Sequence, residues 1–283
     1  MAEQLPVNSS GAKDGGNLYR RLIDIGIALS AERDTNRLME MILLEAKDIT
    51  NADGGTLYIR TDDDKLKFEI MRTDSLKIAL GGTTGKPIAF PPLAMFDPQT
   101  GEANHRNVAT HAAVAGTSIN IPDAYEAEDF DFAGTRKFDA GTGYRSKSFL
   151  TVPLKNSQNN VIGVLQLINA RDRATGEVIP FSAEIQPVIE ALASQAAVAL
   201  DVSQLLAAQK KLLDAFIELI AGAIDAKSAY TGGHCQRVPE LTKMLARAAC
   251  EASDGPFRDF DLTEDQWYEL HLGAYRHDCG KVT

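Results

Sequence analysis

The chain has 283 residues, of which 44% are hydrophobic and 24% are charged, a composition that suits one large or two modest globular domains; we expect two. Its formal net charge of −10 argues against a nucleic-acid binder or a polybasic membrane anchor, because both need positive charge to meet phosphates. The three cysteines lack disulfide-framework spacing and the polar N-terminus lacks a signal-peptide core, so we expect a cytoplasmic protein with no membrane span.

The first elements are two helices and a hairpin. Residues 1–16 are small and polar and are predicted to form a flexible tail. Apolar residues recur at helical spacing from Leu18 to Leu29, and Asp34 is expected to cap a second amphipathic helix that reaches Ile49. Alternating apolar residues then predict strands over 56–60 and 66–71, joined by an acidic turn at 62–64.

A Gly- and Pro-rich stretch over 81–92 precedes a short helix predicted near 108–114. Further strands are predicted over 118–121, 148–154 and 161–169. Together these elements predict an α+β domain over residues 17–183, in which helices flank an antiparallel sheet of five or six strands.

A long helix is predicted next, over residues 184–224. Apart from Pro187 in its first turn, no Gly or Pro occurs between Phe181 and Gly222. A heptad-like seam runs along it through Val188, Leu192, Gln195, Ala199, Val202, Leu206, Gln209, Leu213, Phe216 and Ile220. Two interpretations stay open: a parallel homodimer helix that transmits a signal, or a core helix packed inside one domain.

Three ordered segments carry a family resemblance: TSINIPDAY at 117–125, TGYRSKSFLTVPLKN at 142–156 and VIGVLQLIN at 161–169. They resemble the GAF domain of cyclic-nucleotide phosphodiesterases and adenylyl cyclases, and the likeness covers about residues 20–205. The resemblance implies a small-molecule ligand, of unknown identity, held between the sheet and short helices. It places the ligand-binding residues at Val108, Ala109, Thr110, His111 and Asn169, where amides at a helix start would receive a cyclic phosphate.

The nucleotide-binding GAF subtype carries an Asn-Lys pair, then Phe, then Asp-Glu. This chain keeps Asn169 and Phe181 but has Ala170 in place of Lys, and Ile185 and Gln186 in place of the acidic pair. These departures argue against cyclic-nucleotide binding. The alternative stays open that the domain only dimerises or binds another metabolite.

The segment 225–283 resembles the opening of an HD-GYP domain, a branch of metal-dependent phosphohydrolases associated with cyclic di-GMP. The resemblance implies that His234 and His277 are terminal metal ligands and that Asp278 is a catalytic carboxylate shared between two divalent ions, such as Fe or Mn. Asp225 matches an upstream acidic ligand of the family. Lys281 would lie near the scissile phosphate, where its charge offsets developing negative charge.

The later histidines and the Gly-Tyr-Pro segment of that family would lie beyond Thr283. We therefore expect this segment to be catalytically incomplete as given, as a piece of a longer protein or as a degenerate domain. The leading hypothesis is a signalling protein in which a ligand-binding GAF domain regulates an HD-type phosphodiesterase acting on cyclic di-GMP or a related phosphodiester. The alternative is a non-catalytic module for ligand sensing and dimerisation.

Overall fold

The computed structural model describes residues 10–227 and 233–277. The chain divides into two compact units, Met1–Gln204 and Leu205–Thr283, and the division falls inside one continuous helix. Each unit is described by itself below.

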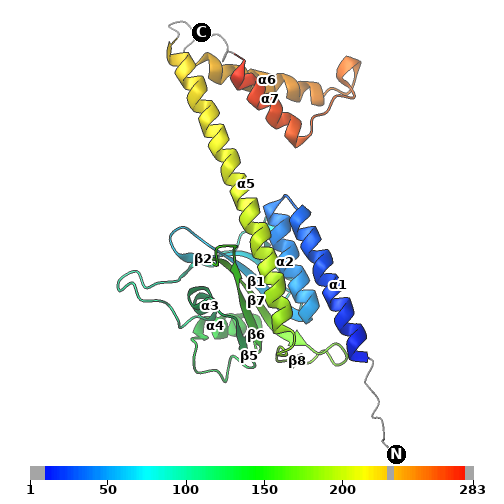
Figure 1. Ribbon diagram of the computed structural model, residues 1–283, viewed down its shortest axis with the longest axis vertical. Coiled ribbons are helices and arrows are strands. Elements are labelled where there is room, and N and C mark those ends of the chain that lie inside the picture. Colours follow the sequence, from blue (N-terminus) through cyan, green and yellow to red (C-terminus); the bar gives the residue numbers. More distant parts are fainter. Residues whose placement is uncertain (1–9, 228–232, 278–283) are drawn as a thin grey trace, which may run out of the picture. The chain divides into compact units, whose positions relative to one another are not determined.

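The first unit is built on one antiparallel sheet (Figure 1). Its main strand order is β3-β2-β1-β7-β6-β5, while β4 pairs with β2 and β8 pairs with β7. The strands are β1 (Ala52–Arg60), β2 (Lys65–Thr73), β3 (Ile78–Gly81), β4 (Leu93–Ala94), β5 (Ile119–Ile121), β6 (Phe149–Lys155), β7 (Val161–Arg171) and β8 (Val178–Ile179). The expected α+β class with an antiparallel sheet is confirmed.

Helices cover one face of this sheet: α1 (Ser10–Ala31), α2 (Thr35–Thr50) and the first turns of α5 (Gln186–Lys227) (Figure 1). Successive strand residues point to opposite faces, so Leu57 enters this core while its neighbour Tyr58 faces the other side. The core side chains Leu38, Ile42 and Leu43 are fully buried, and each such side chain stabilises the fold by about 1.5–3 kcal/mol.

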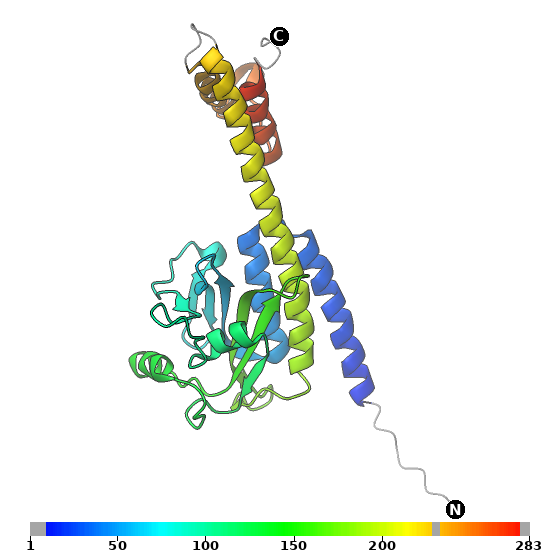
Figure 2. The same cartoon turned by 60° about the vertical axis from the view of Figure 1, so that its left-hand side comes forward.

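On the opposite face the short helix α3 (Val108–Ala115) packs against β6 and β7, and loop residues complete two smaller cores there. A second short helix, α4 (Ala133–Thr142), is mostly exposed and stands away from the sheet (Figure 2). Asp34 caps α2 as predicted, accepting a hydrogen bond from the amide of Arg37. Residues 10–16, expected in the tail, form the first turns of α1. Gly11, Gly15 and Gly16 disfavour a helix there, but extending an existing helix costs little per residue.

The first turns of the long helix α5 pack as a core helix and its later turns are exposed, so the homodimer interpretation stays a prediction. In its first turns Ile189, Leu192 and Ala196 are completely buried in the core of the first unit. Further along, the seam is open to solvent: Val202 is 50% exposed and Leu206 is 60% exposed. Within the described residues, this is the one helix long and apolar enough to cross a membrane by length and composition, and core packing accounts for the apolar residues of its first turns.

The second unit contains the last turns of α5, then α6 (His234–Cys250) and α7 (Glu264–Arg276), with a short 3-10 turn at Gly255–Phe257. Helices α6 and α7 pack against each other. The start of α7 is capped: Thr263 Oγ1 accepts a hydrogen bond from the amide of Gln266, whose side chain in turn accepts one from the amide of Thr263.

Candidate functional sites

The start of α3 is already capped within the chain. Asn107 Oδ1 accepts hydrogen bonds from the amides of Ala109 (2.9 Å) and Thr110 (3.2 Å), the donors expected to receive a cyclic phosphate. Val108, Ala109 and Thr110 are buried, and the Thr110 hydroxyl donates to the carbonyl of Asn104 at 2.7 Å. A phosphate at this helix start would therefore have to displace the side chain of Asn107.

His111 lies on α3 with its ring edge-on to two neighbours, His105 at 4.8 Å and Phe130 at 5.3 Å between ring centroids. Its Nδ1 atom is buried and has no hydrogen-bond partner among the described residues. No cluster of three metal-ligating side chains occurs in the described part of the chain, so the two histidines do not form a complete metal centre there.

Asn169 is buried and has a positive φ of 58°. Its Oδ1 atom accepts hydrogen bonds from the amides of Lys147 (2.7 Å) and Ser148 (3.2 Å), and its Nδ2 atom donates to the carbonyl of Arg145 (2.8 Å). The side chain thus ties the end of β7 to the segment that leads from α4 into β6. This arrangement gives Asn169 a structural task in holding a loop.

A second polar cluster holds the same segment. The carboxylate of Asp53, on β1, accepts hydrogen bonds from the hydroxyls of Ser75 (2.6 Å) and Tyr144 (2.7 Å), and Arg171 lies 3.1 Å away. Burial, followed by the hydrogen bond to Asp53, raises the pKa of the Tyr144 hydroxyl above its usual value. The phenol therefore stays protonated and keeps donating.

Sequence reasoning missed a polar row across the sheet face that α3 covers. Gln166 of β7 stands directly opposite Thr56 of β1 and Thr151 of β6 in the strand register. Its Oε1 atom accepts a hydrogen bond from the hydroxyl of Tyr58 (3.2 Å), and its Nε2 atom donates to Thr151 Oγ1 (3.1 Å). All four side chains are buried, and burial raises the pKa of the Tyr58 hydroxyl. The available signal was a polar residue at an inward position of three otherwise apolar strands.

Aromatic rings continue from this row toward α4. The rings of Tyr58 and Phe68 are 4.7 Å apart, those of Phe68 and Phe90 are 5.5 Å apart, and those of Phe90 and Phe138 are 6.5 Å apart. Phe90 lies between β3 and β4 and is 44% exposed, whereas Phe138 belongs to α4. The polar row and this aromatic column together form the candidate ligand site of the first unit.

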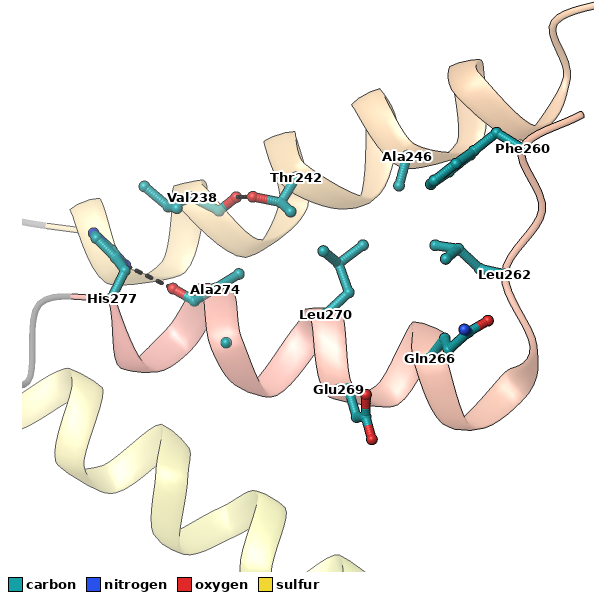
Figure 3. A pocket seen from close by; sticks show the side chains of 11 residues that line it. Val238, Thr242, Ala246, Phe260, Leu262, Gln266, Glu269, Leu270, Ala274 and His277 are labelled. Atoms are coloured by element: carbon teal, nitrogen blue, oxygen red, sulfur yellow. Dashed lines mark hydrogen bonds between the residues drawn. The ribbon is translucent and has the colours of Figure 1, made fainter. Parts of the chain in front are cut away.

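In the second unit, two predicted metal ligands lie side by side although they are far apart in sequence. The Nε2 atoms of His234, at the start of α6, and His277, at the end of α7, are 3.0 Å apart. His277 Nδ1 lies 2.6 Å from the carbonyl of Ala274, which orients the ring (Figure 3). Of the other predicted site residues, Asp278 and Lys281 lie outside the described residues, as does the side chain of Asp225 in α5.

An apolar groove of about 660 Å³ between α6 and α7 leads up to this pair (Figure 3). Val238, Thr242 and Ala246 line it from α6, and Leu270 and Ala274 line it from α7. His277 closes one end of the groove.

Comparison with known proteins agrees with the geometry of the first unit. The family model described as "GAF domain" matches residues 34–200. The chain is 32% identical over 143 residues to a dual 3',5'-cyclic-AMP and -GMP phosphodiesterase 11 of Drosophila melanogaster, and these residues are 49% of this chain and 9% of the relative. It is 33% identical over 109 residues to a dual 3',5'-cyclic-AMP and -GMP phosphodiesterase 11A of Takifugu rubripes, covering 38% of this chain and 11% of that one.

The chain therefore spans about a tenth of the length of these curated relatives. Among solved structures, the GAF domain from a phosphoenolpyruvate-protein phosphotransferase of Coxiella burnetii aligns with a TM-score of 0.50 at 15% identity. That alignment covers 68% of this chain and 97% of the other, and it supports the fold alone.

Proposed function

Because the chain belongs to the GAF domain family, we propose that its first unit is a signalling module whose small-molecule ligand binds at the polar row of Thr56, Tyr58, Thr151 and Gln166. The observation that carries the proposal is this buried row of hydrogen-bonding side chains beside a column of aromatic rings. Polar groups are costly to bury and are retained where they hold a structure together or recognise a ligand.

The chemistry of the row suits the edge of a planar heteroaromatic ring. Gln166 has two N–H donors and two acceptor lone pairs, and its bonds to Tyr58 and Thr151 use one of each. Phe68 and Phe90 supply ring faces for stacking beside it. A purine cyclic nucleotide has both features, and the named activity of the two phosphodiesterase relatives supports cyclic AMP and cyclic GMP as the first ligands to test.

Calorimetric titration of the whole chain with each nucleotide tests this proposal. Ala170, Ile185 and Gln186 argue against a cyclic nucleotide, whereas the polar row and the phosphodiesterase relatives favour one, and the titration decides between them. If a nucleotide binds at the row, Gln166→Leu should weaken it about tenfold or more, since an unpaired polar group in the complex costs about 1–3 kcal/mol. Gln99→Leu, in an exposed turn, is the matched control and should leave affinity unchanged. Absence of heat with both nucleotides would remove cyclic nucleotides as the ligand class.

The His234–His277 pair supports a second function, metal binding in an HD-type phosphodiesterase. Two nitrogens that ligate one octahedral ion at about 2.1 Å lie about 3.0 Å apart, which matches the separation of the two Nε2 atoms. A bound divalent ion would supply Lewis-acid activation of water for hydrolysis of a phosphodiester such as cyclic di-GMP. The residues of this chain would orient that ion: Ala274 holds the ring of His277, and the capped helix α7 presents it.

Cobalt binding tests the metal proposal without relying on activity. The whole chain should take up Co²⁺ and develop a visible absorption band, and His277→Ala should abolish both. His105→Ala removes a histidine of the first unit and serves as the matched control. Equal uptake by the His277→Ala protein would refute the assignment of His277 as a ligand.

The exposed half of α5 supports a homodimer. The seam residues Leu206, Leu213 and Phe216 are apolar, solvent-exposed and spaced for helix pairing. A second copy of α5 would cover them, and a signal from the ligand site would then pass along paired helices.

A further inference from the structure

A contact between α5 and α7 joins two segments of the second unit. The hydroxyl of Tyr268, on α7, donates a hydrogen bond of 2.8 Å to Asp214 Oδ1, on α5. Lys210 lies one turn earlier on α5 and places its ammonium group 4.0 Å from the centroid of the Tyr268 ring. The Tyr268 side chain therefore makes two contacts with α5: a charge-assisted hydrogen bond from its hydroxyl and a cation–π contact on its ring face.

The face of α5 that makes this contact differs from the dimer seam. Asp214 follows the seam residue Leu213 directly, and consecutive helix residues are rotated by about 100°. On the α7 side of the helix Asp214 and Ile217 are half-buried and Ala221 is buried, whereas Leu213 and Phe216 are exposed. The second half of α5 can therefore hold α7 and a partner helix at the same time.

The electrostatics of α7 agree with this packing. His271 follows Tyr268 by about one turn, and its pKa is lowered by burial and by Lys243, against the opposing charges of Asp214, Glu240 and Glu218. Two of these acids, Asp214 and Glu218, belong to α5. The ring of Tyr275 lies edge-on to His271, one turn further along α7. The direct contacts between α7 and α5 are those of Tyr268 with Asp214 and Lys210.

We infer that Tyr268, Asp214 and Lys210 form a positioning clamp that fixes α7 on α5 and thereby sets the placement of His277 against His234. The inference rests on the proposed metal site and adds its regulation. Because α5 is one unbroken helix from Gln186 to Lys227, a rotation or axial shift of α5 is carried through the clamp to α7. Tyr268 is about 13 Å along the helix from His277, so it acts on the site only through the placement of α7.

Amide hydrogen exchange of the whole chain tests the clamp without any metal. Tyr268→Phe removes the hydroxyl and keeps the ring beneath Lys210, and Asp214→Asn removes the charge and keeps the shape. We expect both to accelerate exchange about tenfold in the last two turns of α7 and to leave the sheet unchanged. The double variant should match the single variants, because both remove one shared interaction.

Tyr275→Phe is the matched control, since it removes the other tyrosine hydroxyl of α7 and keeps the ring against His271. Exchange in Tyr268→Phe that equals the control would overturn the inference. Uniformly faster exchange across α5, α6 and α7 would also overturn it, because that result describes general loosening.

A cobalt titration separates the clamp from the metal proposal. With a working site, Tyr268→Phe and Asp214→Asn should weaken Co²⁺ binding about tenfold, while Tyr275→Phe binds as the unaltered chain does. Unchanged Co²⁺ affinity in the clamp variants would refute the positioning role. If the unaltered chain binds no Co²⁺, the metal site falls and with it the effect on His277, whereas the exchange data still decide whether Tyr268 holds α7 on α5.

Discussion

At the scale of single residues, Asn169 has structural partners whether or not a ligand lies beside it, and its role at a ligand stays a prediction. Asn169 was expected beside a ligand, but every polar atom of its side chain bonds to the backbone of residues 145–148. Its positive φ explains why Asn suits the site, because Asn tolerates the left-handed region better than most residues. The sequence pattern identified the residue, and only the fold revealed its partners.

Replacing Asn169 should be costly for this reason. We expect Asn169→Ala to lower the free energy of unfolding by about 3 kcal/mol, because three buried hydrogen bonds are lost. Asn169→Gly should recover about 1 kcal/mol of that loss, since Gly adopts positive φ without strain. Urea unfolding measures both values.

Asn159 is the matched control, because it has a similar φ of 63° in an exposed turn. Asn159→Ala should cost about 1 kcal/mol, the backbone strain alone. Equal losses at Asn159 and Asn169 would contradict the structural task assigned to the buried side chain.

At the scale of elements, strong periodicity was predictive and weak periodicity was not. The two N-terminal helices and α5 carry regular apolar spacing and were predicted. Helix α4 was missed because its sequence contains Gly134 and Gly141 and few apolar residues. Contacts from the flanking loops stabilise α4: the buried carboxylate of Asp139 accepts hydrogen bonds from the hydroxyl of Tyr125 and from Ser146.

The exposed seam of α5 gives the prediction at this scale. Leu206→Asp should convert a dimer into a monomer in size-exclusion chromatography with light scattering, because the charge would be buried at the centre of the helix pair. Ala207→Asp adds the same charge off the seam and should leave the dimer intact. A monomeric unaltered chain would refute the homodimer, and a dimer that survives Leu206→Asp would place the interface elsewhere.

At the scale of the whole molecule, the fold class followed from the sequence but the candidate ligand site did not. Thr56, Thr151 and Gln166 are separated by long stretches of chain, and the strand order alone brings them into one row. Sequence patterns specify which residues alternate and leave open which strands pair. The structure divides the chain after Gln204, within the long helix. The predicted domain boundaries at the two ends of that helix, 183/184 and 224/225, stay predictions.

The two units should unfold separately on heating. The first unit has a large hydrophobic core, whereas the second exposes apolar side chains to solvent, such as Leu245, which is 74% exposed. We expect calorimetry to resolve two transitions, with the second unit melting first. A chain that ends at Gln204 should keep only the later transition, and a single transition in the full chain would contradict this expectation.

The central pairing of the sheet also determines how the protein must fold. Strand β1 is made early, but its main partner β7 follows on the order of a hundred residues later, with Leu57 opposite Leu165. At about 5–20 residues per second, a ribosome needs on the order of 10 s to deliver that partner. Until then one edge of β1 lacks its native partner, and closing so long a loop slows folding. The nascent chain is therefore most prone to aggregation during that interval, and a chaperone would protect it best at that stage.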